Sequence, residues 1–365
     1  MAKILMVHPG PDFSVADVFR GWEKALKKQG HKVMTYNTND RLTFYGRAVF
    51  EEPDQPPCEH CGRLPVHKAA PEPLMVAKLA TAGLFEDAVK FRPDICFFVS
   101  AFFHTADTFQ AIRSLGIKIV MLHTESPYQD DEQMRRGYFA HLNLINDPVN
   151  IGTWKDLGPV AYMPHSYDPE VHYPPKTRNY ELDFAFIGTS FLSRLKFFSA
   201  MNFDGIATAF GGNGWDTVPE EYQHLWRYLG HRPDECVDNT ETARIYRMAK
   251  CGINFYRREG EDTYKGAGYA MGPREVEMAA CGLFFLRDRR PESDEVFGGN
   301  RYLATPDILP VFESPEDAEE KLRWWIAHDS LREKRAAMAR EAIEDRTFDN
   351  RAEEVAEILE ELKIL

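Results

Sequence analysis

Short apolar runs alternate with longer amphipathic segments from the start of the chain. After the run KILMV at 3–7, apolar residues recur at the i, i+3, i+4, i+7 spacing of a helix with one buried face: Val15, Val18, Phe19, Trp22, Ala25 and Leu26. Later runs predict five more strands, HKVMTY, DICFFVS, IKIVML, LNLIN and PVAYM, with helices around 105–115 and 131–141. Continuous apolar strands between amphipathic helices favour a parallel sheet covered on both faces.

A second series of the same kind follows residue 181. Its predicted strands are LDFAFIG, GIATAFG, CGINFY and GLFFLRD, and helices are predicted from about 191, around 240–249 and within 271–282. Ser314, Pro315 and the two acids after them form a strong helix start, and three helices are predicted to finish the chain. The stretch 164–181 has four prolines and little periodicity, so it is the predicted domain boundary.

The predicted fold class is therefore α/β, with two tandem Rossmann-like, doubly wound domains facing a central cleft. A chain of 365 residues suits two domains, because single cores stop growing near ~250–300 residues. The predicted limits are 1–170 for the first domain and 180–345 for the second, with a C-terminal helix at 346–365. A proline-rich, polar surface insert is predicted at about 50–73 in the first domain.

Composition and charge exclude several classes of protein. With 44% hydrophobic residues the chain can bury a sizeable core, which excludes general disorder. No apolar run reaches the ~18–20 residues that span a bilayer, and the N-terminus reads as a strand, not as a signal peptide. Six cysteines in a chain of this length do not indicate a disulfide scaffold, so we expect a cytoplasmic protein. The net charge of -13 disfavours a nucleic-acid partner without excluding a local basic groove.

The segment MGPREVEMAACG at 271–282 is the main candidate binding site. Gly272 and Pro273 allow a close turn into a helix, whose first-turn N–H groups, with the guanidinium of Arg274, suit a phosphate or diphosphate. Glu277 shares a helix face with Arg274 and can accept hydrogen bonds from the vicinal hydroxyls of a ribose. The alternative is an exposed i, i+3 ion pair between Arg274 and Glu277.

Two strand-end loops of the first domain supply candidate bases. Asp12, with His8, follows the first strand and is a candidate general base for an acceptor hydroxyl; its alternative role is in a turn or helix cap. Glu125, with His123, follows the strand IKIVML and is a candidate base or hydroxyl acceptor, or else a cap for the next helix.

Three weaker features complete the candidates. Asn254 ends a predicted strand and is either a polar ligand contact or a turn residue, and the glycine-rich loop GGNGW is weak evidence for close approach of a donor. Cys58 and Cys61 form half of a zinc site, since tetrahedral zinc needs four ligands, and the alternative to a reduced, exposed pair is a site completed by His67 with His60 or a distant side chain; no metal site is predicted.

The motifs DFAFIGTS, CGINFYR, PREVEMAACGLFFLRD, DEVFGGNRYLA and SPEDAEEKLRWWIAHDSLREKRAAMAREAIEDRTFDNRAEEV occur in that order over about 180–360. In this order they resemble the C-terminal half of CgeB-like glycosyltransferases, which have the GT-B fold. The segments HPGPDFSVADVFRGWEKAL and LHTESPYQDD are similar to the N-terminal halves of glycosyltransferases of actinobacterial phages.

The resemblance implies a glycosyltransferase with a nucleotide-sugar donor, a UDP- or GDP-sugar, on the second domain and no required metal or cofactor. It implies that Glu277 holds the ribose and that Arg194 and Lys196 contact the diphosphate. Further residues assigned to the donor are Gly188, Thr189, Asn254, Lys265, Gly272 and Arg274. If the protein is phage-encoded, the expected compartment is the host cytoplasm.

One departure from the related retaining enzymes leaves the stereochemistry open. Those enzymes carry two glutamates separated by seven residues, and here the position eight before Glu277 is Tyr269. Lys265 and Tyr269 are candidate substitutes for the missing glutamate. The acceptor also stays open among a glycan, a small molecule, a protein and a modified DNA base. The alternative functions are a nucleotide-sugar epimerase of the same fold and a non-catalytic nucleotide-sugar binding protein.

Overall fold

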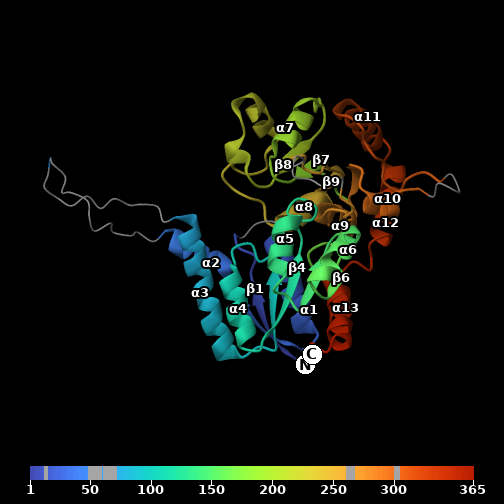
Figure 1. Ribbon diagram of the computed structural model, residues 1–365. Helices are drawn as coiled ribbons and strands as arrows, with labels where there is room; N and C mark the ends of the chain where they lie inside the picture. Colours follow the sequence, from blue (N-terminus) through green and yellow to red (C-terminus); the bar gives the residue numbers. More distant parts are fainter. Residues whose placement is uncertain (12–14, 48–59, 61–71, 260–267, 300–304) are drawn as a thin grey trace.

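Two α/β domains stack on one another in the computed structural model (Figure 1), which describes residues 1–11, 15–47, 60, 72–259, 268–299 and 305–365. The N-terminal domain has a fully parallel six-stranded sheet in the order β2-β1-β3-β4-β5-β6. Its strands are β1 (Lys3–Val7), β2 (Lys32–Tyr36), β3 (Ile95–Val99), β4 (Lys118–His123), β5 (Leu142–Ile145) and β6 (Val160–Tyr162).

Helices cover both faces of this sheet because alternate residues of each strand point to opposite sides. Ile4 and Met6 of β1 join the core that includes α1, whereas Leu5 and Val7 join the core that includes α3 and α4. The elements between the strands are α1 (Val15–Lys28), α2 (Thr38–Gly46), α3 (Pro73–Phe91), α4 (Ala106–Ser114), α5 (Asp130–Gly137), α6 (Ile151–Trp154) and the 3-10 turns η1 (Pro148–Asn150) and η2 (Lys155–Leu157).

The C-terminal domain has a parallel four-stranded sheet in the order β10-β9-β7-β8, over one continuous core rich in phenylalanine. Its strands are β7 (Leu182–Ile187), β8 (Thr208–Gly211), β9 (Ala249–Asn254) and β10 (Phe284–Arg287). Its helices are α7 (Leu192–Ser199), η3 (Trp215–Thr217), η4 (Glu220–Tyr228), α8 (Asn239–Met248), α9 (Pro273–Ala280), α10 (Pro291–Phe297), α11 (Pro315–Ile326) and α12 (Asp329–Glu341).

The α/β class and the doubly wound domains are confirmed, and each predicted strand corresponds to one of β1–β10. Ser314 caps α11 as expected, since its side chain accepts a hydrogen bond from the Asp317 N–H at 3.2 Å. The sequence pattern did not predict α2 and α3. The second of these carries apolar residues on its exposed side too, such as Leu74 and Met75, so it lacks the polar face that marks an amphipathic helix.

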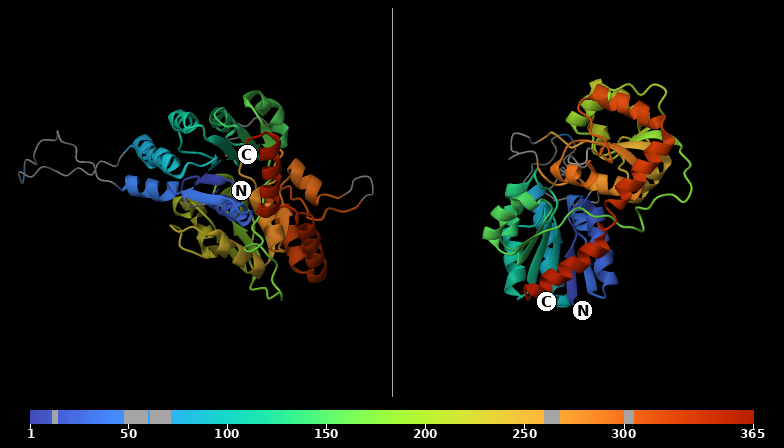
Figure 2. Two further views of the ribbon diagram at one scale, coloured as in Figure 1. Left: turned by 90° about the horizontal axis from the view of Figure 1, so that it is seen from below. Right: turned by 90° about the vertical axis from the view of Figure 1, so that its right-hand side faces the viewer.

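The last helix, α13 (Phe348–Glu361), returns to the N-terminal domain (Figure 2). Phe348 packs against Trp22 of α1 with ring centroids 6.3 Å apart. The two helices approach closely at Gly21, where an added Cβ would lie 2.2 Å from the Phe348 ring. Both chain termini therefore lie together on the first domain (Figure 2).

Buried carboxylates fix the two domains against each other. Glu292 of α10 accepts hydrogen bonds from the Tyr162 hydroxyl at 2.5 Å and from Nη1 of Arg346 at 2.6 Å. Asp147, which follows β5, accepts one from the Tyr269 N–H at 2.9 Å. Charge-assisted bonds of this kind hold an orientation strongly when they are buried, so the strand ends of the two sheets meet across a defined cleft.

Candidate active site in the interdomain cleft

The strand order of the C-terminal sheet reverses between β7 and β9, which is where ligands bind in open α/β sheets. Gly188 follows β7, and its N–H donates to Gly211 O at 2.8 Å. Gly212 has φ +123°, and a Cβ on it would lie 2.3 Å from Gly188 O. The predicted glycine-rich loop thus has a structural reason: only glycine permits this backbone approach between the loops after β7 and β8.

Arg194 joins the loops after β7 and β9. Its guanidinium donates to Thr189 O after β7 at 3.0 Å and to Phe255 O after β9 at 3.0 and 2.8 Å. Burial lowers the pKa of Arg194 to about 10, so it remains a cation at neutral pH. Lys196, two residues on, is exposed in the last turn of α7.

The first turn of α9 is capped from within the protein. The Gly272 N–H donates to Oε2 of Glu275 and to the Tyr256 hydroxyl, both at 3.2 Å. Glu275 also accepts from the hydroxyls of Tyr256 and of Ser293. Burial raises the pKa of Glu275 to about 7. The capping-box glutamate therefore occupies the N-terminal turn that the sequence pattern suggested for a phosphate.

Arg274 and Glu277 form an ion pair, with Nη1 2.7 Å from Oε2. The pair is mostly buried, because the two side chains are 27% and 11% exposed, so the alternative of an exposed ion pair does not describe it. Asn239 of α8 bridges the two: its Oδ1 accepts from Arg274 at 3.2 Å and its Nδ2 donates to Glu277 at 3.3 Å. Sequence reasoning did not single out Asn239, whose signal was its place at the first turn of α8 behind the capping Asp238.

A pocket of about 100 Å³ opens between the domains beside this cluster. Arg274 and the loops after β7 and β8 form one wall, and α1 forms the other. The full set of lining residues is Ala16, Asp17, Arg20, Gly188, Thr189, Gly212, Asn213, Cys236, Val237, Asp238 and Arg274. In the sequence, Ser14 and Asp17 have the spacing of a capping box at the start of the first helix, and nothing in this local pattern indicated a place in the cleft.

Burial raises the pKa of Asp17 to about 6, and the negative charge of Glu277 across the cleft adds to this rise. Arg20 opposes the rise, since its Nη1 donates to Oδ1 of Asp17 at 2.9 Å. Asp17 and Glu277 thus belong to one electrostatic cluster although they come from different domains.

Glu125 lies at the carboxyl end of β4, on the N-terminal side of the cleft. Burial raises the pKa of its carboxyl, and Arg257, from the loop after β9, opposes the rise from 3.7 Å away. Its N–H donates to Oε1 of Gln133 on α5 at 2.9 Å. The nearby His123 is fully buried, and burial lowers its pKa to about 3, so it is a neutral core side chain bonded to Asn143 at 2.9 Å.

Strained backbone accompanies this strand-end region. Ser100 and Ala101 follow β3 and have φ of 60° and 50°, the left-handed region that non-glycine residues rarely adopt. Ser100 Oγ lies 2.8 Å from Oγ1 of Thr124, so the loops after β3 and β4 are joined directly next to Glu125.

The remaining candidates have varied positions. Asn254 ends β9 and is buried, and its Nδ2 has no hydrogen-bond partner within the described residues. Asp12, Lys265, Cys58 and Cys61 lie outside the residues that the structure describes.

Among the described residues, no group of three or more His, Cys, Asp or Glu side chains is placed to hold a metal ion. Within the same ranges, none of the helices combines the length and the apolar composition that crossing a bilayer requires.

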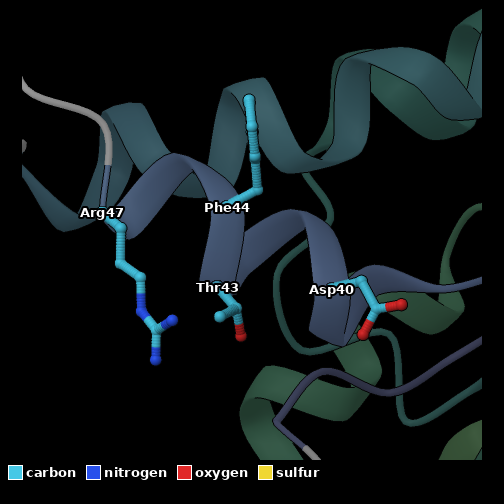
Figure 3. Close-up of a pocket in the computed structure, with 4 residues that line it drawn as sticks. All are labelled: Asp40, Thr43, Phe44 and Arg47. Carbon is cyan, nitrogen blue, oxygen red and sulfur yellow. The ribbon is translucent and has the colours of Figure 1, made fainter.

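A second hollow, of about 460 Å³, lies on α2 far from these residues (Figure 3). Its lining is Asp40, Thr43, Phe44 and Arg47 of this single helix, and Phe44 points away from Thr43 and Arg47. One helix presenting exposed side chains does not enclose a ligand, so the interdomain pocket is the candidate site.

Comparison with known proteins agrees with this architecture. Residues 194–357 match the family model described as glycosyl transferase-like. No curated protein gives a significant sequence match. Among solved structures, the chain is similar to sucrose-phosphate synthase from Thermosynechococcus elongatus, with a TM-score of 0.63 at 11% identity over 100% of this chain and 99% of that one.

Two further similar structures are complexes with UDP-glucose. An alpha-glucosyltransferase in complex with UDP-glucose and DNA containing an abasic site matches with a TM-score of 0.61 at 11% identity, over 98% of both chains. HepE of Anabaena in complex with UDP-glucose matches with a TM-score of 0.60 at 12% identity, over 99% of this chain and 100% of that one. The chain therefore has the GT-B fold, and its residues 194–357 form a glycosyl transferase-like domain.

Proposed function

We propose that this protein is a glycosyltransferase that takes its sugar from a nucleotide-diphosphate sugar bound to the C-terminal domain. The observation that carries the proposal is the Arg274–Glu277 pair at the edge of the interdomain pocket, inside the region that matches a glycosyl transferase-like model. The guanidinium of Arg274 suits the negatively charged diphosphate of a nucleotide, and the carboxylate of Glu277 can accept hydrogen bonds from the ribose hydroxyls.

The donor binds by replacing contacts that the protein makes with itself. In this structure the Arg274 guanidinium donates hydrogen bonds to Glu277 and Asn239, and a diphosphate that enters the pocket competes with them for the guanidinium. Glu277, released from Arg274, then accepts hydrogen bonds from the vicinal hydroxyls of the ribose. The exchange keeps every buried charge partnered, which avoids the large cost of an unpaired buried ion.

A second cation, Arg194, is bonded to the pocket residue Thr189 and supports the leaving diphosphate. Arg194 holds the turn at Gly188 and Thr189 from behind, so its charge reaches the phosphates while most of its bonds remain on backbone carbonyls. Lys196 is exposed in the last turn of α7, and its assignment to the diphosphate rests on the family resemblance. Fixed positive groups of this kind stabilise the negative charge that develops on a departing diphosphate.

The acceptor binds on the N-terminal side, where Glu125 stands at the end of β4. A carboxylate whose pKa is raised by burial is a better proton acceptor at neutral pH than an exposed one, so Glu125 suits a general base for an acceptor hydroxyl. Asp12, in the loop after β1, is the other candidate for this role. The similarity to an alpha-glucosyltransferase in complex with UDP-glucose and DNA makes a DNA base one acceptor to test beside glycans, small molecules and proteins.

The test is a panel of nucleotide sugars with the purified full chain. Thermal unfolding is recorded with UDP-glucose, GDP-mannose, UDP, GDP and, as a negative control, glucose 6-phosphate. A ligand at a hundred times its dissociation constant stabilises a protein by about 2.7 kcal/mol, so a true donor raises Tm clearly. No shift with any nucleotide would contradict the proposal.

Product analysis then separates a transferase from other proteins that bind nucleotide sugars. A transferase releases the nucleoside diphosphate slowly with water and faster with its acceptor. An epimerase converts the donor into a stereoisomer without releasing the nucleotide, and a non-catalytic binder leaves the donor intact.

A further inference from the structure

One carboxylate reaches the donor pocket from the opposite domain. Asp17 stands in the first turn of α1, and its side chain is 24% exposed. With Arg20 it forms the N-terminal wall of the pocket, and the facing wall is formed by Arg274 and the glycine loops of the C-terminal domain.

Only one of the two carboxylate oxygens of Asp17 accepts a hydrogen bond from a described residue. Oδ1 accepts the hydrogen bond from Arg20, and within the described residues Oδ2 has no hydrogen-bond partner. Glu277 differs, because Arg274 binds one of its oxygens and Asn239 the other. Among the described residues, Asp17 is therefore the carboxylate of the N-terminal domain that lines the pocket with an open acceptor position, whereas Asp238 on the opposite wall is the N-cap of α8 and accepts from the Glu241 N–H through Oδ1.

A favourable interaction with the helix dipole does not explain this placement. An acid in the first turn stabilises a helix through the dipole at any exposed position, as Asp107 does at the start of α4. Asp17 is instead partly desolvated and lies near a second negative charge, which raises its pKa and works against the folded state. Titratable groups whose burial destabilises the folded state are concentrated at functional sites.

We propose that Asp17 is a donor-binding residue, whose free carboxylate oxygen accepts a hydrogen bond from a hydroxyl group of the nucleotide sugar. The inference rests on the proposed function. A carboxylate is an acceptor-only group, and a donor offers hydroxyls on both its ribose and its sugar. Recognition of the donor then needs both domains, because α1 supplies one contact and the C-terminal domain supplies the others.

The experiment compares Asp17→Asn with the wild type and with Asp107→Asn, a matched control in the first turn of another helix of the same domain. Affinities for UDP and UDP-glucose are measured by calorimetry, along with those for the GDP forms if the wild type prefers them. We expect Asp17→Asn to bind the nucleotide sugar about 10-fold to 100-fold more weakly, as befits a lost hydrogen bond to a charged group, and Asp107→Asn to bind it normally.

The two ligands locate the hydroxyl. If it belongs to the ribose, Asp17→Asn weakens UDP and UDP-glucose alike; if it belongs to the sugar, only UDP-glucose is weakened. Unchanged affinity for both ligands overturns the inference, including the case where turnover alone falls, since that result would make Asp17 an acceptor-side base. Failure of the wild type to bind any nucleotide is a different outcome, which removes the proposed function itself. Urea unfolding of each variant verifies that it is folded.

Discussion

Asp17 and Glu277 approach each other across the interdomain cleft, one carboxylate from each domain, and Arg274 pairs with Glu277 at 2.7 Å. Asp17 with Arg20, and Glu277 with Arg274, form a cluster of two acids and two arginines beside the interdomain pocket. In the proposed function, the diphosphate of a nucleotide sugar binds Arg274 and the ribose hydroxyls bind Glu277. Substitutions in this cluster and in the loops that border it should therefore change nucleotide binding, stability or turnover in distinct ways.

Removal of the Arg274 guanidinium should weaken nucleotide binding. We expect Arg274→Ala to lower the affinity for UDP by about 1–3 kcal/mol, because a charge-assisted bond to phosphate is lost. Arg244→Ala is the matched control, since Arg244 forms the same i, i+3 pair with Glu241 on the surface of the neighbouring α8. Calorimetric titration with UDP checks the prediction, and equal affinities for the two variants would contradict it.

Glu277→Gln keeps the shape of the side chain but replaces one of its two acceptor oxygens by a donor. We expect its affinity for UDP to fall more than its affinity for 2'-deoxy-UDP. In the proposed function, Glu277 of the wild type accepts a hydrogen bond from the 2'-hydroxyl of UDP, and the deoxy form lacks this hydroxyl. The readout is the ratio of the two dissociation constants in each protein. If the wild type binds the deoxy form as tightly as the ribo form, Glu277 serves only its partner Arg274.

The stability of the protein should depend on pH through Asp17. Its pKa is raised from 3.8 to about 6 in the folded state, so between these values the folded state binds more protons than the unfolded state. The free energy of unfolding therefore falls as pH rises through this window, by roughly 1–3 kcal/mol, and the deficit persists above pH 6. Asp17→Asn should remove this part of the pH dependence and be more stable than the wild type at pH 7.5.

Urea unfolding at pH 4.5 and at pH 7.5 measures the effect. Asp107→Asn provides the control, and its difference between the two pH values should equal that of the wild type. A difference in Asp17→Asn as large as that in the wild type would show that Asp17 does not titrate in this way.

Gly212→Ala should disturb the pocket through the backbone. Its Cβ would lie 2.3 Å from Gly188 O, and the φ of +123° is strained for alanine, so we expect a loss of about 1–3 kcal/mol in stability together with weaker UDP binding. Gly205→Ala separates the two causes, because Gly205 has φ +78° and open space around its Cβ position. Thermal unfolding of both variants, with and without UDP, makes the comparison; a Gly212→Ala protein no less stable than Gly205→Ala would refute the steric argument.

Glu125→Gln should affect the chemical step and not donor binding. If Glu125 is the general base, turnover falls by roughly 10²–10⁴ while the dissociation constant for the donor is nearly unchanged. Donor hydrolysis or transfer is followed by release of the nucleoside diphosphate, beside calorimetry of the same variant. Normal turnover would assign the role to Asp12 or to a mechanism without a protein base.

The sequence by itself determined the class of fold, all ten strands and the segment that carries the candidate donor site. These follow from local pattern: apolar runs such as ICFFV form buried strands wherever they lie, and Pro273 begins a helix because its ring fixes φ and its missing N–H has no partner to lose. The i, i+3 spacing likewise puts Arg274 beside Glu277 on one helix face, because this neighbour relation depends only on helix geometry.

Only the tertiary structure decided which groups partner the candidate residues. Asn239 and Asp17 reach the site from α8 and α1, which lie 35 and 257 residues from Arg274 along the chain, and no local periodicity encodes such an approach. The same holds for Arg194, for which the family resemblance implied a diphosphate contact and whose guanidinium donates to the carbonyls of Thr189 and Phe255. Burial, pKa and ion pairing depend on which surfaces meet across the cleft, and the packing of two whole domains sets that meeting.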